Sequence, residues 1–251
     1  MKTAFITGAT SGFGKAIALR FAGLGYNLIV TGRREERLNE LANQLHSDFN
    51  VEVFTLCFDI RDREACTKAF QTIPENFQHI DILVNNAGLA AGASPFQDSD
   101  LADYEQMIDT NVKGLLYITK LIVPGMIDQQ SGHIINISSI AGIEVYPNGS
   151  VYCASKHAVN AITKGLRIDL IKHGIKVSSV SPGMAETEFS VIRYHGDKEK
   201  ADAVYAGLTP LNADDIADAV EYIVTRPLHV SINDIQLNPA QQANTYIAYR
   251  K

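Results

Sequence analysis

Cysteine is scarce in this chain of 251 residues. The three cysteines, Cys57, Cys66 and Cys153, form no C-x-x-C pair, and their odd number does not suit a set of paired thiols. We therefore expect neither a disulfide framework nor a zinc site, and no other metal site is predicted. The scarcity fits the reducing conditions of the cytoplasm, which is the expected location of the protein.

Positive charge is also in short supply. Lys and Arg number 22 against 28 Asp and Glu, which gives a formal net charge of −6, and no cluster of basic residues stands out. Nucleic acids are bound mainly through their phosphates, so DNA and RNA are not expected as partners.

Long apolar runs are missing as well. The apolar run near the N-terminus ends at Gly8, which makes it too short for the hydrophobic region of a signal peptide or for a membrane span. We therefore expect a protein without a targeting segment and without a membrane partner.

The chain does contain a regular alternation of two patterns. Short apolar runs of strand type are separated by longer segments with apolar residues at helical spacing, as in Ile17, Phe21 and Leu24. This alternation predicts an α/β fold of the doubly wound Rossmann type, with a seven-stranded parallel sheet and helices on both faces. The predicted strands are 3–7, 27–31, 51–58, 80–85, 133–138, 176–181 and 234–237.

No linker rich in Pro, Gly or Ser interrupts this alternation, so residues 1–251 are predicted to form a single domain. Two long irregular stretches, 88–99 and 182–201, begin where predicted strands end. Open parallel sheets bind ligands beyond the carboxyl ends of their strands, so we expect 182–201 to be a substrate loop. Residues 238–251 are expected to form a polar C-terminal tail.

A glycine-rich turn joins the first predicted strand to a helix. Glycine allows close approach of the backbone, and the N-terminus of a helix attracts a pyrophosphate. The spacing is G-x-x-x-G-x-G, not the general G-x-G-x-x-G fingerprint, and glycine-rich turns before helices also occur without any nucleotide. The candidate cofactor-binding residues in this turn are Gly8, Thr10, Ser11, Gly12, Phe13 and Gly14.

Two arginines, Arg33 and Arg34, follow the second predicted strand, where NAD-binding folds usually carry an acidic residue. A planar guanidinium suits the 2′-phosphate of NADP, so NADP is the predicted cofactor. The alternative is that these arginines, with Arg37, pair with the three glutamates between positions 35 and 40 on a solvated helix. That alternative explains the position of Arg33 at the strand end poorly.

Small polar residues follow the third and fourth predicted strands. Asp59, with Ile60, and the sequence Asn85-Asn86-Ala87-Gly88 are placed where they can reach an adenine and a ribose. Asp59 could also be the N-cap of a helix that starts near Arg61, and the two roles are compatible.

Tyr152 and Lys156 are four residues apart in a helical pattern, so they share one helix face. A phenol has a pKa of about 10, but a cation about 4 Å away lowers it by roughly three units, into the range useful for acid–base catalysis. Helices carry such pairs routinely, so this spacing alone does not distinguish a catalytic pair from an amphipathic one.

The order of these motifs resembles the short-chain dehydrogenase/reductase family over nearly the whole chain. The resemblance implies that Tyr152 is the acid–base catalyst and contacts cofactor and substrate, and that Lys156 binds the nicotinamide ribose and lowers the tyrosine pKa. The matching elements are Thr7-Gly8-x-x-x-Gly12-x-Gly14, Asp59, Asn85-Asn86-Ala87-Gly88, Asn111, Ser139, Tyr152-x-x-x-Lys156, and Pro182-Gly183 with Thr187.

The resemblance assigns further roles. Ser139, thirteen residues before Tyr152, hydrogen-bonds the substrate oxygen, and Asn111 holds a water in a proton relay. Pro182 and Gly183 border the cofactor, whose carboxamide Thr187 binds. Cys153 is expected to be a small buried residue, because no histidine is placed to activate it.

Within the family, residues 31–38, 108–111, 132–137 and 182–190 resemble NADP-dependent serine or 3-hydroxy acid dehydrogenases, which also oxidise allo-threonine. This implies an enzyme that moves a hydride between the nicotinamide and the hydroxyl-bearing carbon of a small 3-hydroxy acid. Arg193 is the predicted partner of the substrate carboxylate; the alternative is a solvated loop arginine.

Two other functions stay open. One is the reduction of 3-oxoacyl thioesters or other ketones on the same fold. The other is a non-catalytic NADP-binding regulator, which is disfavoured because redox sensing needs no Ser, Tyr and Lys at these spacings.

The apolar helix 152–171 and the tail with Tyr246, Ile247 and Tyr249, together with the family's usual assembly, lead us to expect a homotetramer. After Leu237 the chain reads Asn-Pro-Ala, where many members have an acidic residue and two glycines.

Overall fold

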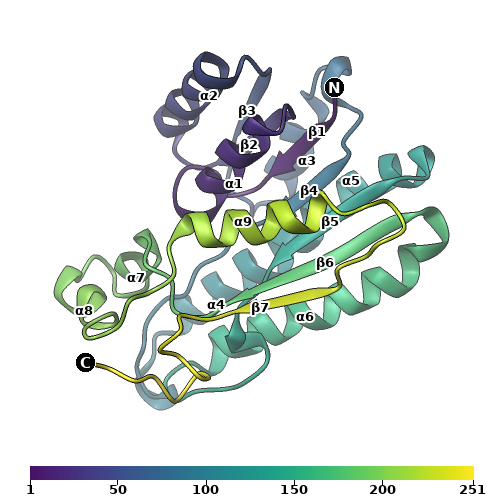
Figure 1. The fold of residues 1–251 in the computed structure, drawn as a ribbon. Coiled ribbons are helices and arrows are strands. Elements are labelled where there is room, and N and C mark those ends of the chain that lie inside the picture. The colour runs from purple at the N-terminus through teal and green to yellow at the C-terminus, as the bar shows by residue number, and fades with distance from the viewer.

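The computed structural model describes all 251 residues and contains one sheet of seven parallel strands. The strand order is β3-β2-β1-β4-β5-β6-β7, as expected for the Rossmann type, so the predicted fold class is confirmed (Figure 1). Each predicted strand is present, with small differences at the ends. The strands are β1 (Thr3–Ile6), β2 (Asn27–Gly32), β3 (Val53–Cys57), β4 (Ile82–Asn85), β5 (Gly132–Ile137), β6 (Ile175–Pro182) and β7 (Asp234–Leu237).

Helices cover both faces of the sheet. The buried apolar residues of α1, α2 and α9 belong to one core, and those of α3, most of those of α5, and Leu170 of α6 belong to another. Tyr152 and Cys153 of α6 belong to a third, smaller cluster. No helix combines the length and the apolar character needed to cross a membrane. The helices are α1 (Gly12–Gly23), α2 (Glu35–Phe49), α3 (Arg63–Gln71), α4 (Leu101–Ile108), α5 (Leu115–Gln129), α6 (Ser150–Leu170), α7 (Glu188–Arg193), α8 (Lys198–Ala203) and α9 (Ala213–Val224).

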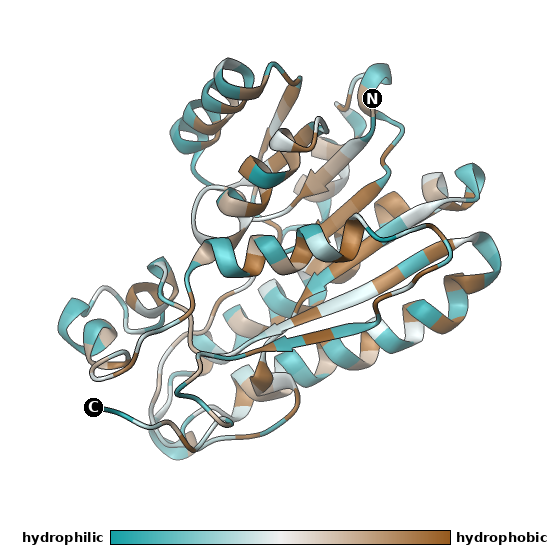
Figure 2. Ribbon diagram, in the orientation of Figure 1, coloured by the Kyte–Doolittle hydropathy of each residue, from teal (hydrophilic) through white to brown (hydrophobic).

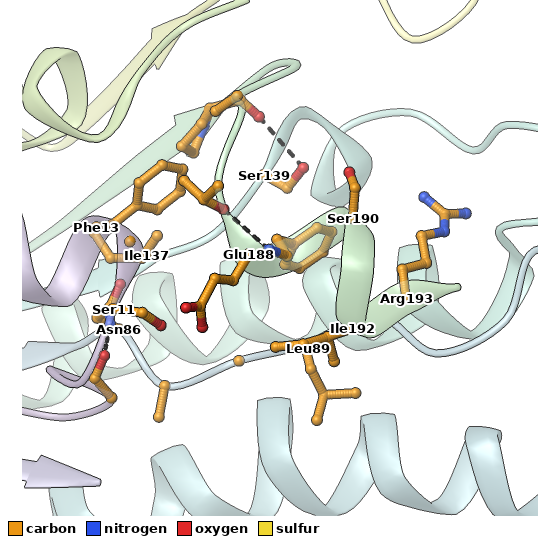
Figure 3. Close-up of a pocket in the computed structure, with 18 of the residues that line it drawn as sticks. Ser11, Phe13, Asn86, Leu89, Ile137, Ser139, Glu188, Ser190, Ile192 and Arg193 are labelled. Carbon is orange, nitrogen blue, oxygen red and sulfur yellow. Dashed lines mark hydrogen bonds between the residues drawn. The ribbon is translucent and has the colours of Figure 1, made fainter. Parts of the chain in front are cut away.

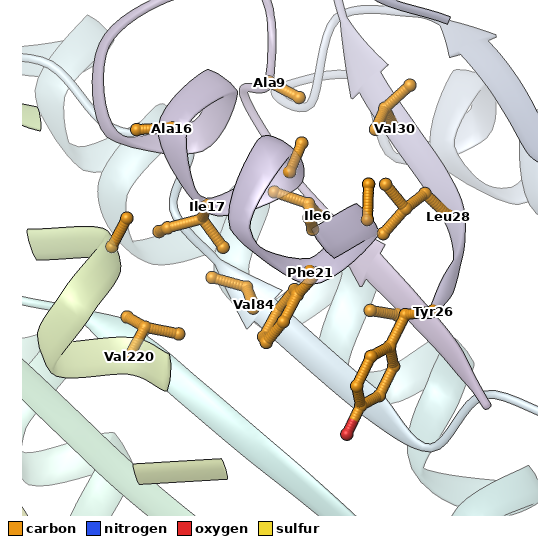
Figure 4. Close-up of a cluster of buried hydrophobic side chains, with 14 of the residues drawn as sticks. Ile6, Ala9, Ala16, Ile17, Phe21, Tyr26, Leu28, Val30, Val84 and Val220 are labelled. Atoms are coloured by element: carbon orange, nitrogen blue, oxygen red, sulfur yellow. The ribbon is translucent and has the colours of Figure 1, made fainter. Parts of the chain in front are cut away.

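The two cores follow from the alternation of side chains along each strand. In β2, Leu28 and Val30 face α1 and α2, whereas Ile29 between them faces the opposite core, and all three are fully buried. This is why the central strands β1, β2 and β4 are mostly apolar (Figure 2). Figure 4 shows Phe21 of α1 among the strand residues that it covers. Leu24, which the helical spacing placed with it, follows the end of α1 and is 38 % exposed.

The order in which strands are added to the sheet reverses between β1 and β4. From β1 the chain crosses to β2 on one side, and after β3 it returns to β4 on the other side of β1. The loops that leave β1 and β4 therefore diverge, which opens a crevice at the carboxyl edge of the sheet.

The 182–201 loop, expected to be irregular, carries α7 and most of α8. Each of these short helices has an N-cap, Thr187 for α7 and Asp197 for α8. The C-terminal tail lies beside them (Figure 1), and the Lys251 amide donates a hydrogen bond to the Gly207 carbonyl oxygen at 2.9 Å. The segments that flank the carboxyl edge are thus tied to one another.

His133 of β5 is buried against β6. Its Nε2 lies 2.8 Å from the Ser178 hydroxyl, which itself donates to the Ile232 carbonyl oxygen, so the ring donates this hydrogen bond. Burial, with a smaller effect of the Lys176 charge, lowers the pKa of His133 to about 3. The folded protein therefore keeps this imidazole neutral.

This buried histidine makes stability depend on pH. Below pH of about 6.5 the unfolded chain takes up a proton on His133 that the folded chain does not, so the free energy of unfolding falls as pH falls. The loss due to this residue is about 2 kcal/mol between pH 7 and pH 5. Urea unfolding at pH of about 7 and about 5 should show that the free energy of unfolding of His133→Gln falls by about 2 kcal/mol less than that of the wild type. The exposed His229→Gln serves as control, and equal pH dependence in all three proteins would contradict a neutral buried His133.

Candidate active site

A cavity of about 600 Å³ lies in the crevice at the carboxyl edge of the sheet. It runs from the turn between β1 and α1 to helix α7. Figure 3 shows Ser11 and Asn86 toward one end and Arg193 at the other. Its volume is typical of a site for a small molecule or cofactor.

In the glycine turn, the backbone after β1 packs directly against the start of α1 and the loop after β4. Gly8 has a φ of +67°, and a Cβ on Gly14 would lie 2.3 Å from the Gly8 carbonyl oxygen. The Asn86 side chain donates hydrogen bonds to the carbonyl oxygens of Thr7 and Gly8, at 2.8 and 3.1 Å. Any side chain at position 14 would push this turn away from the loop after β4.

The N-terminus of α1 fits a pyrophosphate. The helix starts at Gly12, and the N-cap residue Ser11 makes no hydrogen bond from its side chain to the first turn. The first N–H groups of α1 are therefore available to an anion. The candidate residues Gly8, Thr10, Ser11, Gly12 and Phe13 all line the cavity, and their contact with a cofactor stays a prediction. Gly14 supports this turn from behind and is not among the lining residues.

Arg33 and Arg34 both line the cavity. The Arg34 guanidinium donates to the Thr10 hydroxyl at 2.8 and 3.2 Å and to the Ser11 hydroxyl at 2.8 Å. Arg33 lies 3.8 Å from the Asp59 carboxylate. Neither arginine pairs with the glutamates between positions 35 and 40, so the alternative based on the sequence alone is wrong. Both guanidinium groups thus lie at the end of β2 and face the cavity, with Arg34 also paired to Glu188 at 2.8 Å.

Asp59 and Ile60 line the cavity too, but Asp59 is not an N-cap. Helix α3 starts at Arg63, and Asp62 caps it by accepting from the amides of Glu64 and Ala65. Asp59 instead binds Arg61 at 2.6 Å, and this hydrogen bond lowers the pKa of the carboxyl group. Because α3 begins two residues later than the sequence suggested, its N-cap is Asp62, and Asp59 lines the cavity instead.

The Asn85-Asn86-Ala87-Gly88 sequence divides between two environments. Asn86, Ala87 and Gly88 line the cavity. Asn85 is still within β4, and its amide donates to Thr119 and Asn136 inside the protein, both at 2.9 Å. The Asn85 side chain therefore joins β4 to α5 and β5, and it does not line the cavity with its neighbours.

Helix α6 brings Tyr152 and Lys156 to the cavity, and both are buried. The Lys156 ammonium donates to the Ile137 carbonyl oxygen at 3.0 Å and lies 6.0 Å from the centre of the Tyr152 ring. Burial lowers the pKa of Lys156 to about 8, so the amine is still mostly protonated at neutral pH. The helical spacing places the two side chains together as predicted.

The sequence predicts that Lys156 lowers the pKa of Tyr152, but in the structure other groups determine this pKa. Burial is the largest influence, and it raises the pKa of this phenol; the Ser139 hydroxyl and the charge of Arg193 act to lower it. Ser139 faces the cavity, and its hydroxyl donates to the Pro182 carbonyl oxygen at 3.3 Å. Ser139 and Arg193, rather than Lys156, are therefore the groups that counteract the burial of Tyr152.

Asn111 supports the site from a buried position outside the cavity lining. It lies in a π-helical turn, Asp109–Gly114, between α4 and α5, and π-helical turns are frequent at functional sites. Its side chain accepts from the Leu89 amide and donates to the Leu89 carbonyl oxygen, both at 2.8 Å, and donates to the Ser155 hydroxyl at 2.9 Å. The carboxamide joins α6 to the loop after β4; its place in a proton relay stays a prediction.

The loop after β6 closes the other side of the cavity. Pro182, Gly183 and Thr187 line it as predicted, and the Thr187 hydroxyl accepts from the Phe189 amide at 3.2 Å. Thr187 also faces the glycine turn, because a Cβ on Gly12 would lie 3.5 Å from it. The two loops meet over the cofactor end of the cavity.

Arg193 lies at the end of α7 and lines the cavity. Its guanidinium donates to the Gly92 carbonyl oxygen and to the Tyr146 hydroxyl, both at 3.2 Å. No carboxylate lies within ion-pair distance of it, whereas the imidazole of nearby His195 contacts the Asp103 carboxylate at 3.1 Å. Arg193 therefore brings an unpaired positive charge to the same cavity as Tyr152.

Several lining residues were not predicted from the sequence. Some lie in loops that no motif marks and others lie on α7, within the predicted substrate loop; Phe189 packs edge-on against Tyr152, with the ring centres 5.8 Å apart. Only aromatic and hydroxyl side chains near the predicted loops could have suggested them. They include Tyr146, Phe189, Ser190, Ile192 and Tyr205.

Comparison with known proteins accounts for this arrangement. The family described as short chain dehydrogenase matches residues 2–196. Sulfoacetaldehyde reductase 2 of Chromohalobacter salexigens is 48 % identical over 95 % of this chain and 94 % of its own. Serine 3-dehydrogenase of Rhizobium radiobacter is 44 % identical over 96 % and 95 % of the two chains. The closed form of a serine dehydrogenase complexed with NADP+ superposes with a TM-score of 0.92, 41 % identity and 99 % coverage of both chains.

The seven-stranded sheet, the glycine turn and the Ser139, Tyr152 and Lys156 side chains all lie within the matched region, and the predicted family is confirmed. The chain belongs to the short-chain dehydrogenase family.

Proposed function

We propose that this protein is an NADP-dependent oxidoreductase that interconverts a small hydroxy acid, of the serine or 3-hydroxybutyrate type, and the matching carbonyl compound. The observation that carries the proposal is the unpaired Arg193 guanidinium in the cavity that also contains Tyr152. A partly buried charge without a counter-ion is costly unless a ligand supplies one.

NADP is the proposed cofactor because the protein offers groups for each of its charged parts. The N-terminus of α1 fits the pyrophosphate, and Arg33 and Arg34 at the end of β2 fit the 2′-phosphate. A serine dehydrogenase with the same fold forms a complex with NADP+, which supports this choice.

When bound, NADP supplies or accepts the hydride. The side chains of this protein then handle the proton and the geometry. Tyr152 gives the substrate oxygen its proton in reduction and takes it in oxidation, and Ser139 donates a hydrogen bond to the same oxygen. The Ser139 hydroxyl and the Arg193 charge favour the ionised form of the phenol. Lys156, held at the Ile137 carbonyl oxygen, is placed to bind the nicotinamide ribose beside Tyr152.

An acidic substrate agrees with what the relatives act on. Serine carries a carboxylate and sulfoacetaldehyde carries a sulfonate, and both are anions that a guanidinium binds through two N–H groups. The Nε and Nη1 atoms of Arg193 already have partners, and Nη2 has none in this structure. The guanidinium is thus held in position with a donor to spare.

The alternatives are less well supported. A reductase of 3-oxoacyl thioesters or bulky ketones does not need a cation at this end of the cavity, and a regulator without catalysis does not need Ser139, Tyr152 and Lys156 in one cavity. Activity on a panel of hydroxy acids, sulfonates, thioesters and ketones separates these functions.

We further propose a homotetramer. Ile168 and Ile171, at the end of α6, are 75 % and 73 % exposed, and the tail residues Tyr246, Ile247 and Tyr249 are exposed as well. Apolar surface of this kind is usually covered by another subunit. Light scattering should give the mass of four chains at micromolar concentration, and the mass of one chain would contradict the proposal.

Replacing Tyr152 with Phe removes the acid–base group and keeps the ring that packs on Phe189. Turnover should fall by about 10² to 10⁴, which is the usual contribution of a positioned proton donor. Steady-state rates measure it, with the buried but distant Tyr26→Phe as matched control. A Tyr152→Phe enzyme with more than about a tenth of wild-type turnover would show that another group transfers the proton.

Replacing Arg193 with Met should weaken the binding of acidic substrates and leave the binding of neutral ones almost unchanged. We expect KM for serine or 3-hydroxybutyrate to rise roughly ten- to a hundredfold, since a charge-assisted hydrogen bond contributes about 1.5 to 3 kcal/mol. KM for a neutral alcohol of similar shape should stay nearly constant. The matched control, Arg226→Met, lies outside the cavity and should leave KM for both substrates unchanged. Equal effects of Arg193→Met on acid and neutral alcohol would remove Arg193 from substrate recognition.

A further inference from the structure

Glu188 links helix α7 to the cofactor end of the cavity. It is the first residue of α7, and its two carboxylate oxygens bind two different arginines, Arg34 at 2.8 Å and Arg37 at 2.7 Å. Figure 3 shows its side chain pointing away from Arg193 and toward Ser11. No other ion pair connects the 182–201 loop to the turn between β2 and α2.

The surroundings of Glu188 form a site for an anion. Arg34 donates to Thr10 and Ser11 on one side of its guanidinium and to Glu188 on the other. The hydrogen bond from Arg34, with a further one from Arg37, lowers the pKa of Glu188, so the side chain is a carboxylate at neutral pH. Arg34 at the end of β2, together with Arg37 of α2, therefore already holds one anion, and this anion belongs to the protein.

We propose that Glu188 is a cofactor-specificity residue, whose carboxylate occupies Arg34 of the 2′-phosphate site and is displaced from it when a nucleotide with a 2′-phosphate binds. This inference rests on the proposed use of NADP. It goes further because it gives the enzyme an internal competitor for one phosphate group, carried on the loop that also bears Thr187 and Arg193.

Competition, rather than a shared complex, follows from charge. A phosphate monoester carries a charge of about −1.5 to −2 near neutral pH, and at Arg34 it would meet the Glu188 carboxylate on the same guanidinium group. Like charges at such distances repel, and each arginine gains more from the doubly charged group than from the singly charged one.

The ion pairs of Glu188 are weak enough to be exchanged. The side chains of Glu188, Arg34 and Arg37 are 43 %, 39 % and 45 % exposed, and water screens pairs of this kind. Their loss should therefore change the affinity for a 2′-phosphate by about two- to tenfold rather than abolish it.

Displacement of Glu188 also acts on the substrate end. Glu188 begins α7 and Arg193 ends it, and the far end stays attached through Arg193 to Gly92. When Glu188 leaves the arginines, the first turn of α7 loses its tie to the cofactor site while the last turn keeps its own. The 2′-phosphate is thereby coupled to the position of the loop above the substrate.

The affinities of Glu188→Gln for NADP and NAD test the proposal. The matched control is Glu186→Gln, which removes a charge two residues earlier from a side chain that forms no ion pair. Titration calorimetry should show Glu188→Gln binding NADP about two- to tenfold more tightly than the wild type, with NAD affinity unchanged and no effect of Glu186→Gln.

The other outcomes are distinct. A wild type that binds NADP and NAD equally would overturn the proposed cofactor itself. A wild type that prefers NADP, together with a Glu188→Gln variant whose affinity for NADP is unchanged, weaker, or increased equally for NAD, would overturn the role of Glu188 alone.

Hydrogen exchange gives a second readout that does not depend on turnover. Addition of 2′,5′-ADP, which has the 2′-phosphate but no nicotinamide, should speed amide exchange at the start of α7 in the wild type, and 5′-ADP should not. In Glu188→Gln the exchange should be fast before any addition. Equal responses to the two nucleotides in the wild type would contradict the displacement.

Discussion

The site depends on the contact between two backbone segments, the turn after β1 and the loop after β4. The two segments are close enough that Gly14 has no space for a side chain, and the hydroxyl of Thr7 accepts hydrogen bonds from the amides of Asn86 and Ala87 at 3.0 and 2.9 Å. This contact directs the N-terminus of α1 into the crevice. It also brings the loop after β4 to Asn111, and through Asn111 to α6 and its tyrosine.

The sheet and much of the site could be predicted from the sequence because the signals are local. The central strands β1, β2 and β4 are buried on both faces and are therefore mostly apolar, so they are visible in the sequence as short apolar runs. The carboxyl ends of parallel strands meet at one edge, which is why Asp59, Asn86 and Ser139 could be placed in one cavity. The i, i+4 spacing of Tyr152 and Lys156 needed only a helix.

The remainder depends on contacts between distant parts of the chain. Arg34 pairs with Glu188, 154 residues away, and not with a glutamate of its own helix. Asn85 and Asn86 are neighbours in sequence, but only the fold shows that one faces Asn136 and the other the glycine turn. The balance of burial and charge at Tyr152 likewise depends on groups that arrive from several loops.

The π-helical turn between α4 and α5 makes this part of the chain sensitive to length. A π-turn contains one residue more than an α-turn, and each residue of an α-helix rotates the next by about 100°. Loss of a single residue from Asp109–Gly114 would merge α4 and α5 into one regular helix and rotate Asn111 away from Leu89 and Ser155. Among natural or engineered variants, this segment should therefore accept changes of residue type far more readily than insertions or deletions.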